Sequence, residues 1–364
     1  GKPNHPEVIA INANAEQFSD KVIVATTINE ILPKEQEIKS HKTRVVDGEN
    51  IPKNDTEEVM ETSLSGMDEV YRMDFEDMEK KITPATKAVV AVHMRGVPCN
   101  MDAVMAIAKK YNLKVIEDCA QSYCCEYKGK YAGTFGDIGC FSLNDFKHIS
   151  AGDGGMVVTD NEELYYKALM FADKNFNRLG TEVVKNAPYL APNYRMNELT
   201  AAVGIAQLDK VKDICAKRNV YGDKLNAALQ GIKGLKPMKV LDDCNCSYWF
   251  YMFRIDEAEM GATRAEFVNA LRAEGVPAQA GYMPTCVYQY DMFKNGTIYP
   301  GATKCPLDGT YGGRVKEYKD GDCPEAEAIL STCIKLNVNE FYTEQDLAET
   351  IEAIQKVCNY FNNK

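Results

Sequence analysis

The feature that most constrains this chain is an alternation, from about residue 84 onward, of short apolar runs with segments of helical periodicity. The first of these runs, residues 87–94, is continuous and rich in β-branched residues, which is typical of a strand that is covered on both faces. Between the first two runs, residues 101–111 repeat their apolar side chains at helical spacing. The four predicted strands are KAVVAVHM (87–94), LKVIEDCA (113–120), GCFSLN (139–144) and GGMVVTD (154–160). This order predicts an α/β fold that is built from βαβ units.

The second half of the chain indicates a smaller unit. Residues 196–230 keep a helical apolar period, as one long helix or two, and end at the glycine-rich stretch QGIKGLKP. A strongly β-prone segment, YWFYMFRID, follows, and a last amphipathic helix is predicted at 343–361. We therefore predict a large α/β domain at 1–234 and a small α+β domain at 235–364.

Two helix starts carry the pattern of a capping box, in which a short polar residue is followed three positions later by an acid. Asp160 with Glu163 would open a helix directly after the fourth strand. Thr263 with Glu266 would open a helix in the smaller unit, and Gly275 would end it.

Composition excludes several classes of protein. Lysine and arginine number 42 and the acids 53, so the net charge is −11, which argues against binding nucleic acid through its phosphates. No apolar stretch is long enough to span a membrane, and the N-terminus lacks the pattern of a signal peptide. Thirteen irregularly spaced cysteines fit no disulfide framework, and no common zinc motif occurs. We expect a cytoplasmic enzyme with reduced thiols and no metal.

An acid and a lysine fall at neighbouring ends of the predicted strands. Asp118 ends the second strand, Lys147 lies in the loop after the third, and the turn Gly152 to Gly155 follows it. Ligands of parallel α/β sheets gather at these carboxyl ends. A lysine and an aspartate there could serve pyridoxal phosphate, the lysine as a Schiff base and the carboxylate facing the pyridine nitrogen. From the residues alone, a solvated lysine, a capping or paired acid and an ordinary hairpin turn are the favoured interpretation.

Several motifs in register resemble the DegT/DnrJ/StrS family of pyridoxal-phosphate-dependent sugar aminotransferases. The likeness runs from about Tyr71 to Leu225 and continues more weakly toward the C-terminus. Its motifs are E-D-x-A-Q at 117–121, G-x-x-G-D-x-G-x-F-S at 133–142, Lys147, G-D-G-G at 152–155 and N-Y-R-M at 193–196. The resemblance implies fold type I, as in aspartate aminotransferase, with a large mixed-sheet domain and a small C-terminal α+β domain.

The resemblance also implies roles for particular residues. Lys147 would bind the cofactor covalently and then move a proton between the substrate and the cofactor. Asp118 would pair with the pyridinium nitrogen, Gln121 would lie near the ring, and Ser142 would bind the phosphate. Asn193 would reach the phosphate of a neighbouring subunit, so a homodimer is expected.

Three further residues near the implied cleft are interpreted first as structural. His148 follows the lysine directly, and a substrate contact is its alternative role. His93 and Tyr282 fall in stretches near the cleft, where packing is the favoured interpretation over chemistry.

One family feature is not found in the sequence. Members carry an S-G-T-type turn whose amides hold the cofactor phosphate at a helix N-terminus, and residues 1–80 show no such turn, only one candidate strand, KVIVATTI. Either the phosphate is held differently here, or the natural chain has residues that this sequence lacks.

The function predicted from the resemblance is amino transfer from glutamate or glutamine to a keto sugar, for which a nucleotide-linked sugar is expected, or to a keto cyclitol. A sugar dehydratase with the same cofactor is the first alternative, although that branch replaces the lysine with histidine. Part of that branch carries an iron–sulfur cluster, for which Cys244 and Cys246 are the only close non-adjacent pair. A non-catalytic family member that acts as a binding or regulatory dimer is the second alternative.

Overall fold

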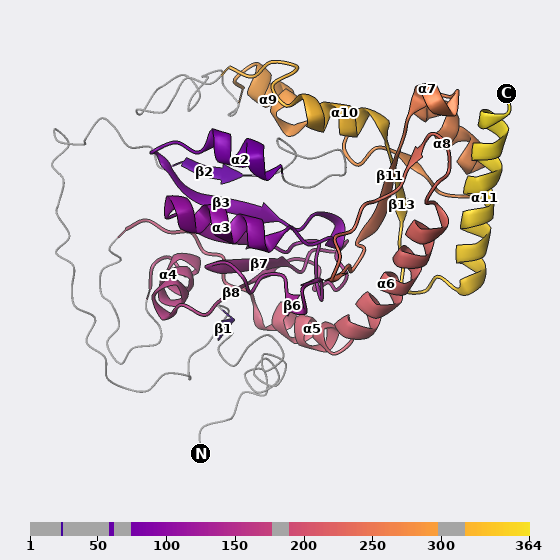
Figure 1. Cartoon of the computed structure of the whole chain (residues 1–364). Coiled ribbons are helices and arrows are strands. Elements are labelled where there is room, and N and C mark those ends of the chain that lie inside the picture. Colours follow the sequence, from indigo (N-terminus) through magenta and orange to yellow (C-terminus); the bar gives the residue numbers. More distant parts are fainter. Residues whose placement is uncertain (1–22, 25–57, 62–73, 177–188, 298–316) are drawn as a thin grey trace.

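A six-stranded mixed sheet forms the centre of the first part of the molecule (Figure 1). The computed structural model describes residues 23–24, 58–61, 74–176, 189–297 and 317–364. In the sheet, β2, β3, β4 and β7 run parallel to one another. At one edge, β8 pairs antiparallel with β7, and β1 pairs antiparallel with β8. The strand order is β1 (Ile23–Val24), β8 (Gly155–Thr159), β7 (Ile138–Ser142), β4 (Lys114–Asp118), β3 (Thr86–Val92) and β2 (Glu58–Glu61). All four strands predicted in this region are present.

Helices connect these strands and cover the sheet. The crossover helix between β3 and β4 is α3, Met101–Tyr111, with the bounds that its periodicity predicts. It buries Met101 and Val104 against Val89 and Val115 of the sheet. The other helices here are α2 (Phe75–Lys81) and α4 (Glu162–Ala172).

The predicted cap of α4 is wrong by one residue. Asn161, rather than Asp160, is the N-cap, and its Oδ1 accepts a hydrogen bond from the Leu164 amide at 3.0 Å. Asparagine and aspartate cap helices about equally well, so the pattern of neighbouring polar residues did not fix which of them takes the cap position.

Residues 196–230 form two helices, α5 (Glu198–Leu208) and α6 (Val211–Ala228). Beyond them lies a four-stranded antiparallel sheet in the order β12, β13, β11, β9. Its strands are β9 (Leu235–Lys236), β11 (Phe250–Ile255), β12 (Gln279–Ala280) and β13 (Cys333–Asn337). The helices of this part are α7 (Glu257–Met260), α8 (Arg264–Ala273), α9 (Asp291–Lys294), α10 (Pro324–Thr332) and α11 (Glu344–Asn362).

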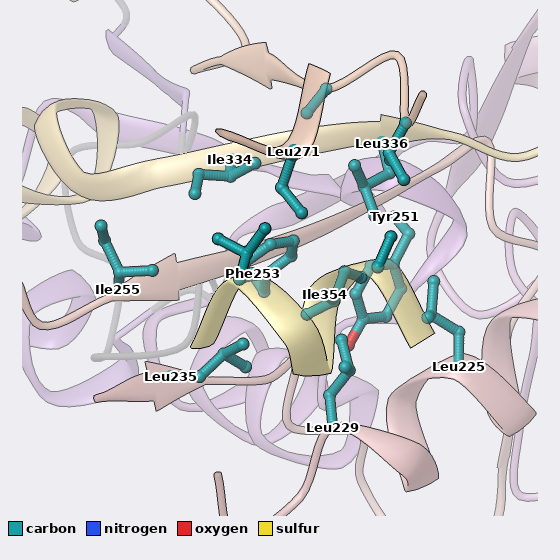
Figure 2. Packing of buried hydrophobic residues seen from close by; sticks show 14 of the residues in the cluster. Leu225, Leu229, Leu235, Tyr251, Phe253, Ile255, Leu271, Ile334, Leu336 and Ile354 are labelled. Carbon is teal, nitrogen blue, oxygen red and sulfur yellow. The ribbon is translucent and has the colours of Figure 1, made fainter. Parts of the chain in front are cut away.

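Figure 2 shows the core of this second part. Phe253 of β11 and Ile334 of β13 are fully buried and face Ile354 of α11. Leu225 and Leu229 of α6 enter the same core. Burial of large apolar side chains from α6, β11, β13, α11 and neighbouring elements is the main stabilising contribution here, at about 25 cal/mol per Å² removed from water.

The division at residue 234 stays a prediction. The strands of the six-stranded sheet precede it and those of the four-stranded sheet follow it. A small three-stranded sheet nevertheless joins the two regions, because β10 (Cys244–Asn245) pairs with β5 (Glu126–Tyr127), which pairs with β6 (Lys130–Tyr131). The sequence did not indicate this long-range pairing.

The sequence led to two further expectations, which concern disulfide bonds and membrane-spanning helices. Twelve of the cysteines lie within the described ranges, and all twelve are free thiols. Within those ranges, no helix has both the length and the hydropathy needed to cross a lipid bilayer.

The capping box predicted for α8 is present. Thr263 Oγ1 accepts from the Glu266 amide at 3.2 Å, and Glu266 Oε2 accepts from the Thr263 amide at 2.9 Å. We expect Thr263→Ala to lower the free energy of unfolding by about 1 kcal/mol. The Glu266 amide loses its acceptor, and the reciprocal hydrogen bond from the Thr263 amide to the Glu266 carboxylate is weakened. Chemical denaturation checks this, with Ser331→Ala as the control, because the Ser331 hydroxyl is exposed and only donates to the Ala328 carbonyl. Equal destabilisation by both variants would contradict the account.

Candidate active site

The carboxyl end of β4 places Asp118 between two parallel strands. Asp118 lies in register with Val92 of β3 and Cys140 of β7. Its carbonyl accepts from the His93 amide at 3.1 Å, and its Oδ1 accepts from the Ala120 amide at 2.9 Å. The carboxylate is therefore fixed at the edge of the sheet where ligands of parallel α/β folds bind.

The loop between β7 and β8 carries Lys147 and returns through the glycine turn. Gly152 and Gly154 have backbone φ angles of 83° and 122°, which residues other than glycine rarely adopt. At Gly155 an added Cβ would lie 2.7 Å from the Phe141 carbonyl oxygen. The turn thus needs glycine for its own backbone, because it leads directly into the antiparallel pairing of β7 with β8.

The Lys147 side chain is half-buried beside an aromatic wall. Its Nζ lies 4.3 Å from the ring centroid of Trp249, a cation–π contact, and the Trp249 indole N–H donates to the Phe146 carbonyl. Burial lowers the pKa of the Lys147 amine, and the nearby negative charge of Asp118 opposes that shift. The fold therefore brings the predicted lysine and the predicted aspartate within electrostatic reach of each other.

Gln121 joins the Asp118 strand end to the second part of the molecule. Its Oε1 accepts from the Arg95 amide at 2.8 Å, and its Nε2 donates to the Tyr282 hydroxyl at 3.4 Å. Tyr282 stacks on Phe250 with ring centroids 4.9 Å apart. Burial raises the pKa of Tyr282 above its usual value. Tyr282 thus packs against Phe250 and also takes part in the hydrogen bonds that Gln121 makes.

The remaining predicted residues lie in different surroundings. Ser142, at the end of β7, is half-buried, and its Oγ accepts from the Asn144 amide at 3.3 Å. Asn193 is exposed, forms a β-bridge with Asp173, and accepts from the Arg195 amide at 3.4 Å. Their roles toward a cofactor phosphate stay predictions, and most of residues 1–80, where the phosphate-binding turn was sought, fall outside the described ranges.

A cavity of about 490 Å³ lies against Lys147. Of the predicted site residues, only Lys147 lines it. Side chains from the second part of the chain that the sequence analysis did not single out also line it, and they are Arg218, Trp249 and Lys335. Arg218 is ion-paired with Glu340 at 2.8 Å and donates to the Trp249 carbonyl at 3.2 Å. That Trp249 is the only tryptophan of the chain was the one signal that could have drawn attention to this wall.

His93, Glu117 and Cys119 form a fully buried cluster below the site. His93 Nδ1 accepts from the Cys99 amide at 3.1 Å, so the other ring nitrogen carries the proton and donates to Glu117 at 3.0 Å. The Glu117 oxygens also accept three amides of the loop 133–136, each at 2.7 Å. Burial raises the pKa of the Cys119 thiol. Since these atoms are already used and the thiol stays protonated, the cluster holds the loop against β4 rather than a metal.

His148 is also buried, and its Nε2 lies 3.0 Å from the Ser247 carbonyl oxygen. Burial lowers its pKa to about 3, and Arg218 acts in the same direction. The imidazole is therefore neutral near pH 7 and donates to that carbonyl, which agrees with the structural interpretation of both histidines.

Sequence comparison decides the family. The sequence profile of the DegT/DnrJ/EryC1/StrS aminotransferase family matches residues 63–308, which is more than half of the chain. The chain belongs to this family. The expected family, fold type I and an aminotransferase enzyme are confirmed.

Individual relatives agree with this assignment. The chain is 32% identical over 285 residues to GDP-perosamine synthase of Escherichia coli O157:H7, covering 76% of this chain and 71% of that protein. It is 30% identical over 288 residues to the spore coat polysaccharide biosynthesis protein SpsC of Bacillus subtilis, with coverage of 77% and 69%. The X-ray structure of an aminotransferase from Psychrobacter cryohalolentis superposes with a TM-score of 0.69 at 27% identity, covering 82% of this chain and 75% of that one.

The family implies pyridoxal phosphate, and the side chains at the strand ends fit that group. An amine that forms an imine must spend part of its time unprotonated, and burial lowers the Lys147 pKa in that direction. Asp118, at the end of the paired strand β4, supplies a carboxylate that the Ala120 amide holds, and the aromatic wall of Trp249 and Phe250 offers flat apolar surface.

Proposed function

We propose that this family member is a pyridoxal-phosphate-dependent aminotransferase that moves an amino group from glutamate or glutamine to an acceptor. The acceptor is a nucleotide-linked keto sugar or a related keto cyclitol. The observation that carries the proposal is the half-buried Lys147 side chain, whose amine lies over the Trp249 ring and which lines the cavity. The similarity to GDP-perosamine synthase and to a polysaccharide biosynthesis protein supports a sugar acceptor.

Each site residue has a distinct part in this proposal. When bound, pyridoxal phosphate supplies the electron sink for the pair released from a Cα–H bond and carries the amino group between two half-reactions. Lys147 Nζ would bind the cofactor aldehyde and move the proton to and from the substrate Cα. The Asp118 carboxylate would keep a proton on the pyridine nitrogen, and Gln121, held by the Arg95 amide, would lie beside the ring.

The phosphate of the cofactor would be bound in part by the Ser142 hydroxyl and in part by Asn193 of a second subunit. Support for a homodimer comes from exposed apolar side chains that gather near Asn193 in the sequence. They are Tyr189, Leu190, Tyr194, Leu199 and Val203, together with Phe146 beside Lys147. A cytoplasmic location agrees with the free thiols and stays a prediction.

The two alternatives predict different outcomes. A dehydratase of the related branch would have histidine where this chain has Lys147, so the residue favours amino transfer. A non-catalytic dimer would have no need of a half-buried lysine that lines a cavity.

A single half-reaction tests the proposal without knowledge of the acceptor. The purified chain, loaded with pyridoxal phosphate and mixed with glutamate or with glutamine, should release one equivalent of the matching keto acid per site. The coloured aldehyde form of the cofactor should be lost in parallel. Keto acid from neither donor would overturn amino transfer, and loss of water from a keto sugar with no nitrogen gained would favour the dehydratase.

A further inference from the structure

We propose that Lys335 binds an anionic group of a substrate, a carboxylate or a phosphate, in the cavity that Lys147 also lines. The inference rests on the proposed aminotransferase function and adds to it a residue that selects the substrate. Lys335 carries no motif of its own, and its position in the fold is what draws attention to it.

The strand β13 presents Lys335 on the side of the sheet opposite to the main core. Successive side chains of a strand alternate between faces, and the neighbours Ile334 and Leu336 are both buried in the core of Figure 2. Lys335 lies in register with Met252 of β11 and Gln279 of β12. It is thus a lysine in an inner strand, which is an uncommon place for a residue that is mostly exposed.

The side chain reaches the same aromatic wall that Lys147 contacts. Lys335 Nζ lies 5.1 Å from the ring centroid of Phe250, and the rings of Phe250 and Trp249 are 5.1 Å apart. Lys147 Nζ lies over the Trp249 ring. Both lysines line the cavity, together with Asn144, Asn337 and Asn339, whose side-chain amides are of a kind that donates to oxygen atoms of a ligand.

The charge of Lys335 is not balanced by the described part of the chain. No carboxylate of those residues pairs with it, and its one side-chain acceptor is Gln279 Oε1 at a long 3.4 Å. Arg218, which lines the same cavity, is by contrast paired with Glu340. Burial lowers the pKa of Lys335, and Lys147 is the other described lysine with such a shift. A half-desolvated cation without a counter-ion is unfavourable until an anion joins it.

The substrates of the proposed reaction supply such anions. Glutamate and glutamine carry a carboxylate on the reacting carbon, and a nucleotide-linked sugar carries phosphates. Because Lys147 is reserved for the cofactor and Arg218 for Glu340, Lys335 is, among the described residues that line this cavity, the cation left for the ligand. Binding of either anion would restore the missing counter-charge.

Binding to the full chain tests the inference independently of turnover. Trp249 is the only tryptophan and lines the cavity, so its fluorescence reports on occupancy, and calorimetry gives the affinity. The probes are glutarate for a carboxylate and inorganic pyrophosphate for a phosphate. Lys335→Met keeps the stem over Phe250 and removes the charge, and we expect it to weaken binding of one probe about tenfold or more, as for a lost charge-assisted hydrogen bond. Lys335→Arg should restore most of the affinity.

The matched control is Lys236→Met, an exposed lysine of the same sheet that pairs with Asp256. It should bind both probes as the wild type does. Unchanged affinity of Lys335→Met for both glutarate and pyrophosphate would overturn the inference, as would an equal loss in Lys236→Met.

Kinetics separate the two anion sources and keep this test distinct from that of the function. If the anion is the donor carboxylate, Lys335→Met raises the KM for glutamate about tenfold with little change in kcat. If it is a phosphate, the KM for the nucleotide-linked acceptor rises instead. A wild type that binds the probes through Lys335 but transfers no nitrogen would refute the proposed function alone, whereas a transferring enzyme with unchanged KM values in Lys335→Met would refute the anion site alone.

Discussion

Replacing Lys147 with alanine should lower the rate of amino transfer by about 10³-fold, within the range that a positioned proton-transfer group contributes. The Lys147 amine is the group that would both bind the cofactor aldehyde and move the Cα proton, and its burial lowers its pKa toward the unprotonated form that both tasks need. The measurement is the rate of keto-acid release from glutamate by the loaded enzyme, with circular dichroism to show that the variant is folded.

Two further variants define what the loss means. Lys147→Arg keeps the charge over the Trp249 ring but cannot form the imine, and it should be nearly as inactive as the alanine variant. Lys130→Ala is the matched control, because Lys130 also lies over an aromatic ring, 4.6 Å from the Phe135 centroid, but is exposed and outside the cavity. Retention of the wild-type rate by Lys147→Ala would contradict the catalytic role.

Replacing Glu117 with glutamine should lower the free energy of unfolding by about 3 kcal/mol, because a buried carboxylate that only accepts hydrogen bonds would become an amide that must also donate. Its oxygens accept from His93 and from the amides of Gly133, Phe135 and Gly136. Two of these donors would face an NH₂ group. Denaturant unfolding gives the change, and Glu163→Gln, an exposed acid of α4, is the control that should shift stability by less than about 0.5 kcal/mol.

The same interaction predicts a pH dependence. Burial alone would raise the Glu117 pKa, but the hydrogen bonds from His93 and the loop amides outweigh it and hold the pKa below its usual value. A lowered pKa contributes stability that is present above the unfolded-state value of about 4.3 and is lost as the pH falls through the folded-state value. The stability difference between wild type and Glu117→Gln should therefore shrink below about pH 4. A difference that stays constant down to pH 3 would contradict this.

Local patterns in the sequence predicted the framework well. The short apolar runs predicted β3, β4, β7 and β8, and the helical apolar period predicted α3 with its observed bounds. These elements can be predicted from neighbouring residues, because the apolar pattern of a buried strand or of an amphipathic helix is visible within about ten positions of the sequence. The cap of α4 was misplaced because Asp160 and Asn161 are equally suited to it.

The site could be predicted only in part, because half of it comes from distant segments. Asp118 and Lys147 were predicted from strand ends and from a family resemblance, and the fold places them at the ends of the paired strands β4 and β7. Trp249 directly precedes β11, which the sequence showed only as β-prone, and Lys335 belongs to β13, which the sequence did not show. Their approach to Lys147 depends on how the two sheets pack, and no local period encodes that packing.

The most direct test of the account is to find which lysine takes up the cofactor. The purified full chain is incubated with pyridoxal phosphate, reduced with borohydride, digested and mapped by mass spectrometry. The account predicts one modified residue, Lys147. Modification of another lysine, with Lys147 recovered unmodified, would contradict the active site described above.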